Sequence, residues 1–317
     1  MSAVAHAPAS PLRTARALWD LARPKGGAAL MLVPLVGYGF AHWDYALDLV
    51  RPGAMLLVLA SWFVASAGTM WLNAALDGDE DGALFAVGTH RPEGLARFGY
   101  AALAVGVALS AATGTHALVP CALCAVLAIL YSHPRTTWKA HPILGPAVNA
   151  AGYGVLSPLA GWLVVGKPLT FRAVVVHLVI GVWILGATFA AQAFQQKDDA
   201  RRGYRTLVVT HGPAACLRAT RASFYFSVGA LAVLAAAGYL PRLLLAGLPI
   251  FALADRWLAA WRRQPGGGDP SWAAGFLIRV LVGGCVLVLL SCADFALDAA
   301  AERPAAGLAT ARGRPLE

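Results

Sequence analysis

A group of oxygen-bearing side chains follows a long apolar run. Residues 54–76 are mostly apolar, and Asn73, Asp77 and Asp81 follow one another at intervals of four residues at its end. On a helix, residues four apart share a face, so the three side chains could reach a single site. Carboxylate and amide oxygens are the ligands of Mg2+, which keeps positions open for phosphate oxygens. An acidic, solvated loop between helices would account for the same spacing.

Two further polar stretches interrupt the apolar sequence. Residues 131–142 are basic, and residues 192–203 mix amides, carboxylates and arginines. Arginine and lysine side chains hold phosphate oxygens, whereas carboxylates such as those of the second stretch can help to hold Mg2+. Each stretch alone could be ordinary solvated sequence.

The composition is that of a membrane protein. Of the 317 residues, 59% are hydrophobic and only 13% are charged, whereas soluble domains carry about a quarter charged residues. The net charge of +9 could suit nucleic acid. However, the basic residues fall between apolar runs and do not line one polar face, as expected of loops that face anionic lipid. We therefore expect a lipid bilayer as partner and no nucleic acid.

Nine apolar stretches approach the roughly 20 residues that cross a bilayer. They predict an all-α, polytopic membrane protein with helices at residues 26–43, 53–76, 95–115, 116–132, 143–165, 173–196, 222–240, 243–261 and 272–297. The eighth is the least secure because it contains Asp255 and Arg256, and Arg279 in the ninth is expected to hydrogen-bond to another helix.

The chain divides into three segments on this interpretation. Residues 1–22 form an N-terminal segment without the apolar core of a signal peptide, residues 23–298 form the transmembrane domain, and residues 299–317 form a tail that we expect to be disordered. Cys121 and Cys124 have the spacing of a metal site, but no second pair accompanies them in their apolar run. We interpret both as packing residues.

The distribution of Lys and Arg predicts the orientation of the spans. Basic residues concentrate in the N-terminal segment and in the loops after spans two, four, six and eight. The positive-inside rule therefore places these segments in the cytoplasm, in an inner membrane of bacterial type. All three polar stretches then share the cytoplasmic face. A lipid diphosphate fits such a site, because Mg2+ and basic residues bind the diphosphate and the apolar bundle accepts the hydrocarbon tail.

The motifs resemble those of the UbiA superfamily of intramembrane prenyltransferases, over nearly the whole chain. Its first Asp-rich motif is similar to Asn73-x-x-x-Asp77-x-x-x-Asp81 with Arg91-Pro92, and its diphosphate-contacting loop is similar to Tyr131-Ser-x-Pro-Arg135-x-x-x-Lys139. Residues 149–161, which include Asn149 and Tyr153, resemble its fifth helix, and residues 199–207 resemble the end of its second motif.

The resemblance implies a fold, an activity and a set of site residues. The fold is nine helices around a central cavity, and the activity is Mg2+-dependent transfer of a prenyl group from a prenyl diphosphate to an aromatic, quinone-type or other lipophilic acceptor. The implied catalytic residues are Asp77, Asp81 and Asp199. The implied metal ligands are Asn73, Asp77, Asp81, Gln195 and Asp199. The implied substrate-binding residues are Asn73, Arg91, Tyr131, Arg135, Lys139, Asn149, Tyr153, Gln195, Lys197 and Arg202.

Two positions depart from the family pattern. Ala74 follows Asn73 where the family usually has a second Asp, and Gln195 stands where the second motif normally begins with Asp. Gln195 brings an amide oxygen but no charge, so the second Mg2+ should bind more weakly.

Two other functions remain open at this stage. A terpene cyclase on the same fold would quench the cation within one molecule, and its product would form without an acceptor. A non-catalytic lipid transporter or binding protein would not require Mg2+.

Overall fold

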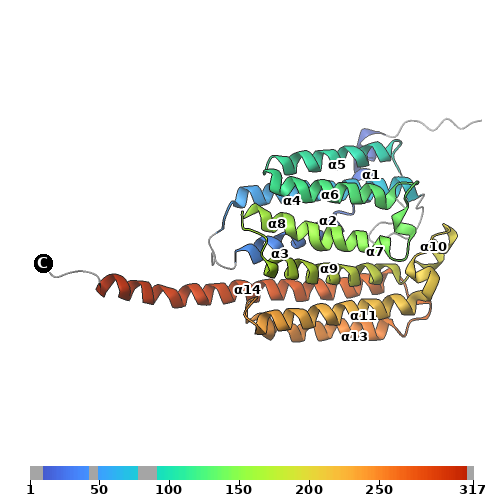
Figure 1. The fold of residues 1–317 in the computed structure, drawn as a ribbon. Coiled ribbons are helices and arrows are strands. Elements are labelled where there is room, and N and C mark those ends of the chain that lie inside the picture. Colours follow the sequence, from blue (N-terminus) through green and yellow to red (C-terminus); the bar gives the residue numbers. More distant parts are fainter. Residues whose placement is uncertain (1–9, 43–48, 78–90, 313–317) are drawn as a thin grey trace, which may run out of the picture.

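The computed structural model describes residues 10–42, 49–77 and 91–312, and every regular element in these ranges is a helix (Figure 1). The first half comprises α1 (Pro11–Leu21), α2 (Pro24–Leu30), α3 (Leu32–Ala41), α4 (Pro52–Asp77), α5 (Leu95–Ala111), α6 (Thr115–Ser132), η1 (Trp138–Ala140), α7 (Leu144–Asn149), η2 (Ala150–Leu156) and α8 (Ser157–Val164). The second comprises α9 (Phe171–Gln192), α10 (Gln196–Arg201), α11 (Leu207–Ala236), α12 (Leu244–Gly247), η3 (Leu248–Phe251), α13 (Ala252–Trp261), η4 (Pro265–Gly267) and α14 (Pro270–Arg312).

Seven helical segments are long and apolar enough to cross a membrane. They are residues 52–76, 115–132, 144–164, 171–192, 207–236, 244–261 and 270–298. The expected count of nine is not confirmed within the described ranges. The first expected span is divided into α2 and α3, and α5 has 17 residues, which is about 26 Å against a hydrocarbon layer of about 30 Å.

The apolar core has two parts. One cluster joins the helices of the first half and includes Trp62, Leu72 and Leu103, whereas the other joins α9 to α14 and includes Phe224, Leu258 and Trp261. Figure 1 shows the two sets of helices side by side, with α9 as the helix of the second set that lies next to the first. Small residues permit close helix contacts, as is usual in membranes: a Cβ on Gly154 would lie 2.6 Å from the Gly181 Cα atom.

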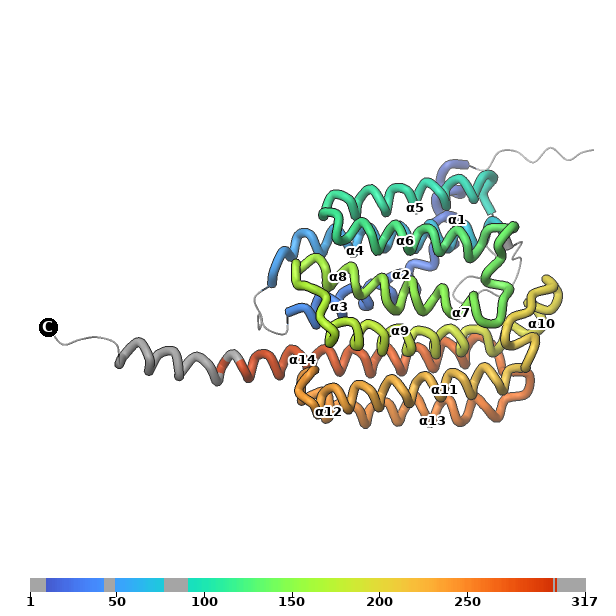
Figure 2. The backbone as a smooth tube through the Cα atoms, in the orientation of Figure 1, coloured from blue at the N-terminus to red at the C-terminus, as the bar shows by residue number. Residues whose placement is uncertain are grey.

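Three helix boundaries differ from the sequence-based expectation. The seventh span begins at Leu207, well before residue 222, and α11 is kinked at Gly212 (φ 78°), which precedes Pro213. The sixth ends at Gln192. Helix α14 runs to Arg312, beyond residue 297, and projects past the other helices (Figure 1); Figure 2 shows the same bundle as a tube. The alanine-rich sequence after residue 298 accounts for this continuation, because alanine has the highest helix propensity.

Candidate functional site

Asn73 lies in the last turn of α4, and its side-chain oxygen accepts two hydrogen bonds. The donors are the Lys139 Nζ and the Ser132 Oγ, each 3.3 Å from the Asn73 Oδ1. A carbonyl oxygen has two lone pairs, so both are engaged. In this arrangement Asn73 holds the lysine at the end of the helix. Asp77 is the last residue of α4, four residues further on, and Asp81 lies outside the described residues.

Lys139 is the most deeply buried of the predicted phosphate-binding residues. It lies on the short helix η1 with 6% of its surface exposed, and burial lowers the pKa of its amine to about 8. The Nζ lies over the ring of Tyr204, 5.9 Å from the centroid. In addition, the Arg205 backbone N–H donates to the Ala140 carbonyl at 2.9 Å. These contacts join the basic loop to the residues that directly follow the second polar stretch.

Asp199 lies on α10 and is 4% exposed. Burial raises the pKa of its carboxyl group, and a hydrogen bond from Thr206 opposes the shift. The Thr206 Oγ1 donates to the Asp199 Oδ2 at 2.7 Å, and the Arg202 Nη1 lies 3.9 Å from the other carboxylate oxygen. Asp199 is therefore a buried carboxylate that is held on both sides.

The second polar stretch crosses the break between α9 and α10, and this break sets the positions of its side chains. Gln195 is the residue before α10, its backbone oxygen accepts from the Asp199 N–H at 2.9 Å, and its side chain is half-buried. Asp198, the other carboxylate of α10, pairs with Arg201 at the outer side of this helix. This pairing leaves Asp199 as the buried carboxylate of α10.

A pair of tyrosines connects the two polar stretches to the fifth span. Tyr131 is hydrogen-bonded to the Asn149 side chain, and Asp199 and Arg23 are close enough to it to interact electrostatically. Tyr153 lies near Tyr131 and near the hydroxyl of Thr69. It belongs to η2, a π-helical turn, and such turns often occur at functional sites.

Arg23 is a neighbour of both tyrosines that the sequence analysis did not include among the site residues. It precedes Pro24, has a left-handed backbone (φ 51°), and burial lowers the pKa of its guanidinium. The Arg-Pro pair could have indicated an unusual backbone, because a proline disfavours the right-handed helical region for the preceding residue. Its proximity to the tyrosines had no local signal. Ser132, Tyr204 and Thr206 lie within the motifs quoted above, but they were not named as site residues.

The structure does not bring every predicted residue into this cluster. Arg135 and Lys197 are exposed, and no described contact joins their side chains to the residues above. Arg91 is half-buried, and its Nη2 atom has no hydrogen-bond partner among the described residues. Of the aromatic residues near the site, Trp71 donates to the Leu18 carbonyl at 2.8 Å and so fixes α1 against α4.

The described side chains of the site include few oxygen ligands for Mg2+. Among the described residues, no group of three or more His, Cys, Asp or Glu side chains converges. Asp199 and Gln195 supply described oxygens, whereas the Asn73 oxygen already accepts two hydrogen bonds and the side chain of Asp77 lies outside the described part. Such oxygens fit a hard cation. Arg202 lies beside Asp199, Arg23 lies near Tyr131, and Lys139 lies over the ring of Tyr204. These described cations can attract an anionic ligand.

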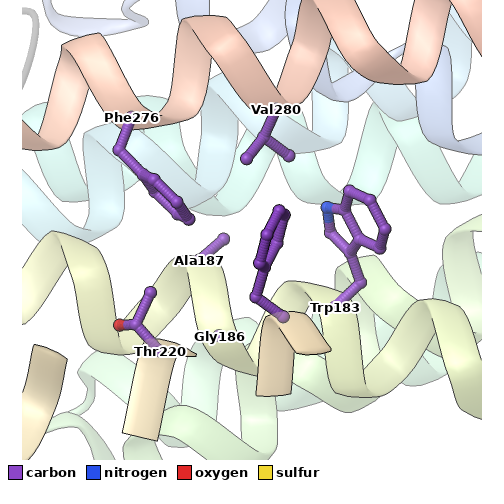
Figure 3. A pocket seen from close by; sticks show the side chains of 7 residues that line it. Trp183, Gly186, Ala187, Thr220, Phe276 and Val280 are labelled. Atoms are coloured by element: carbon purple, nitrogen blue, oxygen red, sulfur yellow. The ribbon is translucent and has the colours of Figure 1, made fainter. Parts of the chain in front are cut away.

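Figure 3 shows a separate cavity of about 10 Å³ between α9, α11 and α14. Aromatic side chains from all three helices surround it, together with the hydroxyl-bearing Thr220; the lining residues are Trp183, Gly186, Ala187, Thr220, Phe224, Phe276 and Val280. Its volume is that of about one water molecule. This cavity is therefore too small for a prenyl chain.

The structure is therefore that of a helical membrane protein with a buried polar cluster at one end. The UbiA prenyltransferase family matches residues 30–281. The chain therefore belongs to the UbiA prenyltransferase family and is a prenyltransferase of the membrane.

Individual relatives agree with this assignment. The chain is 28% identical over 211 residues to a protoheme IX farnesyltransferase from Xanthomonas euvesicatoria pv. vesicatoria (strain 85-10), a match that covers 63% of this chain and 70% of that protein. A UbiA homologue from Archaeoglobus fulgidus bound to DMAPP and Mg2+ has the same fold, with a TM-score of 0.63 and 17% identity over 87% of this chain and 99% of that one. A digeranylgeranylglyceryl phosphate synthase has a TM-score of 0.61 and 16% identity, over 89% of this chain and 98% of that one.

Proposed function

We propose that this prenyltransferase transfers a prenyl group from a prenyl diphosphate to a lipophilic acceptor within the membrane, with Mg2+ as cofactor. The observation that carries the proposal is a cluster of cations around the buried Asp199 and its tyrosine neighbours. Arg202 lies 3.9 Å from Asp199, Arg23 and Asp199 both interact with Tyr131, and Lys139 lies over the ring of Tyr204. Buried cations without enough carboxylates to neutralise them require an anion. A diphosphate supplies the charge, and the apolar bundle behind the site accommodates a hydrocarbon tail.

The chain's own residues then act on the leaving group. Lys139, held by Asn73, and Arg23 contact the diphosphate oxygens and stabilise the negative charge that develops as the allylic carbon–oxygen bond breaks. The Tyr131 hydroxyl, positioned by Asn149, donates to the same group. We assign the stabilisation of the allylic cation to the ring of Tyr153, which lies near Tyr131.

The proposed Mg2+ ligands are Asp77, Asp81, Gln195 and Asp199, together with diphosphate oxygens. When bound, Mg2+ neutralises the leaving group. Thr206 and Arg202 hold the Asp199 carboxylate in place. Asn73, whose amide oxygen already accepts from Lys139 and Ser132, acts on this proposal by positioning the lysine. The attacking acceptor loses its proton to a carboxylate or to the released diphosphate.

The experiment is a product assay on the purified chain in lipid nanodiscs. DMAPP, GPP and longer prenyl diphosphates are each incubated with Mg2+ and with phenols, quinones, alcohols or protoheme IX, the last because of the name of the similar farnesyltransferase. Prenylated acceptor and acceptor-dependent diphosphate release are the expected result. A cyclised product without acceptor would identify a cyclase instead, and binding without bond cleavage would identify a non-catalytic lipid-binding protein.

A further inference from the structure

Eight charged residues lie within the membrane-spanning helices of the second half, and four of them are grouped on neighbouring helices outside the site described above. These four are Arg221 on α11, Asp255 and Arg256 on α13, and Arg279 on α14. Ionisable side chains at membrane depth are costly and usually serve a function. The three arginines, which we call the arginine belt, outnumber the single carboxylate, so this surface carries a net positive charge.

Arg279 is held against the ring of Trp257. Its guanidinium lies 3.9 Å from the centroid of the Trp257 ring, and its Nη1 donates to the Gly275 carbonyl at 2.8 Å on its own helix. The expected hydrogen bond to another helix is therefore replaced by a stacking contact. The Trp257 indole donates to the Trp272 carbonyl at 2.9 Å, and a Cβ on Gly275 would lie 2.5 Å from its ring. Because glycine has no side chain, Gly275 leaves room for the Trp257 ring.

Arg221 and Arg256 continue the belt across two neighbouring helices. The Arg221 Nε lies 3.1 Å from the Asp255 Oδ1, and this pair is 39% and 25% exposed. Asp255, which pairs with Arg221, and Trp257, which contacts Arg279, are about 200° apart around α13. Arg256 lies halfway between them along the chain, so it projects between these two contacts. Arg256 is exposed and makes no hydrogen bond or ion pair with the described residues. The positive charges therefore face outward from the bundle.

The belt lies toward the end of the bundle that holds the site. Helix η4 joins α13 to α14 there, since a Cβ on Gly267 would lie 2.0 Å from the carbonyl oxygen of Ala193, next to the second polar stretch. Arg256 is five residues before the end of α13, or about 8 Å, and Arg279 is nine residues after the start of α14, or about 14 Å. The Arg279 side chain returns toward the helix start to reach Gly275. The guanidiniums thus approach the depth of lipid phosphates, which lie in the interfacial layer.

We propose that the arginine belt binds the phosphate of an anionic phospholipid in the leaflet on the side of the site. A lipid phosphate at this depth supplies the missing negative charge, and Arg256 and Arg279 approach it from two helices. Basic pockets between membrane helices recognise anionic headgroups in this way. The proposal does not depend on the reaction that the enzyme catalyses.

Native mass spectrometry of the full chain in detergent tests the proposal. Phosphatidylglycerol and phosphatidylcholine with identical acyl chains are titrated separately. We expect tighter binding of phosphatidylglycerol, and a loss of about fivefold in its affinity for each of Arg256→Gln and Arg279→Gln, which corresponds to about 1 kcal/mol per arginine. Phosphatidylcholine binding should not change.

Arg242→Gln is the matched control, because it removes an exposed arginine at the opposite end of the bundle. It should retain the phosphatidylglycerol affinity of the wild type. Equal affinities of the wild type for the two lipids, wild-type affinity in Arg256→Gln, or an equal loss in Arg242→Gln would each overturn the proposal. Arg256→Gln decides the matter even if Arg279→Gln unfolds, because Arg256 has no described partner to lose.

Discussion

One buried cation links the structure of the site to its pH dependence. Lys139 has a pKa of about 8, against an ordinary value of 10.5. Below about pH 8 its amine is charged in the folded and the unfolded chain, whereas between about pH 8 and 10.5 it is neutral only in the folded chain. Binding that needs the cation is therefore lost as pH rises through about 8. Over the same window the folding stability rises, because the unfolded chain binds more protons.

We expect kcat/KM for a prenyl diphosphate to fall above pH 8, approaching tenfold per pH unit, because this quantity reports the free enzyme. Lys139→Arg is the control, since its guanidinium stays charged and should flatten the decline. Measuring both pH profiles at saturating Mg2+ checks the expectation. Parallel profiles for the two proteins would show that Lys139 is not the titrating group.

Gln195 tests the metal part of the proposed mechanism. Gln195→Asp adds a carboxylate one helical turn before Asp199, at a half-buried position. If the side chain faces a metal, the new charge should lower the Mg2+ concentration needed for half-maximal turnover, by about tenfold for an added interaction of about 1.4 kcal/mol. Lys197→Asp, at an exposed neighbouring position, is the control. Lost activity with an unchanged Mg2+ requirement would exclude a metal-facing role for Gln195.

Close contacts between neighbouring helices depend on individual glycines. In α3, a Cβ on Gly37 would lie 1.8 Å from the Pro158 carbonyl oxygen of α8, whereas a Cβ on Gly39 would meet no atom within 4 Å. Gly37→Ala should force α3 and α8 apart and destabilise the protein by roughly 1–3 kcal/mol. Gly39→Ala should be neutral or stabilising, by up to about 1 kcal/mol, because alanine favours a helix more than glycine.

Thermal unfolding of the two variants in the same detergent tests this difference. Since both substitutions add one methyl group to the same helix, unequal effects report the contact with α8. Equal unfolding midpoints for the two variants would contradict the close packing of α3 on α8.

The whole molecule has its candidate site at one end, and the positive-inside rule predicts that this end faces the cytoplasm. Arg263, next to η4, and Arg242, between α11 and α12, are exposed at opposite ends of the bundle. In a background without the exposed cysteines Cys285 and Cys292, Arg263→Cys should react with a membrane-impermeant maleimide only in inside-out vesicles. Arg242→Cys should react only in intact cells. The reverse pattern would place the site outside the cytoplasm.

The sequence by itself determined the helical membrane bundle and most of the candidate site. Apolar runs specify helices locally, since each backbone group in a bilayer must be paired within its own segment. The positions of Asn73, Lys139 and Asp199 followed from motifs at the ends of such runs. Composition also indicated a membrane protein, because few soluble domains contain so few charged residues.

The tertiary structure alone decided which partners each of these residues has. It brought Arg23 beside Tyr131, Thr206 onto Asp199, and Lys139 onto the amide of Asn73. In the structure the first expected span is two helices, and the seventh begins at Leu207 and not at residue 222. Asp198 pairs with Arg201 at the outer side of α10. Contacts between residues far apart in the chain, and the burial that shifts the pKa of Lys139, arise from packing against other helices. They therefore leave no periodic pattern in the local sequence.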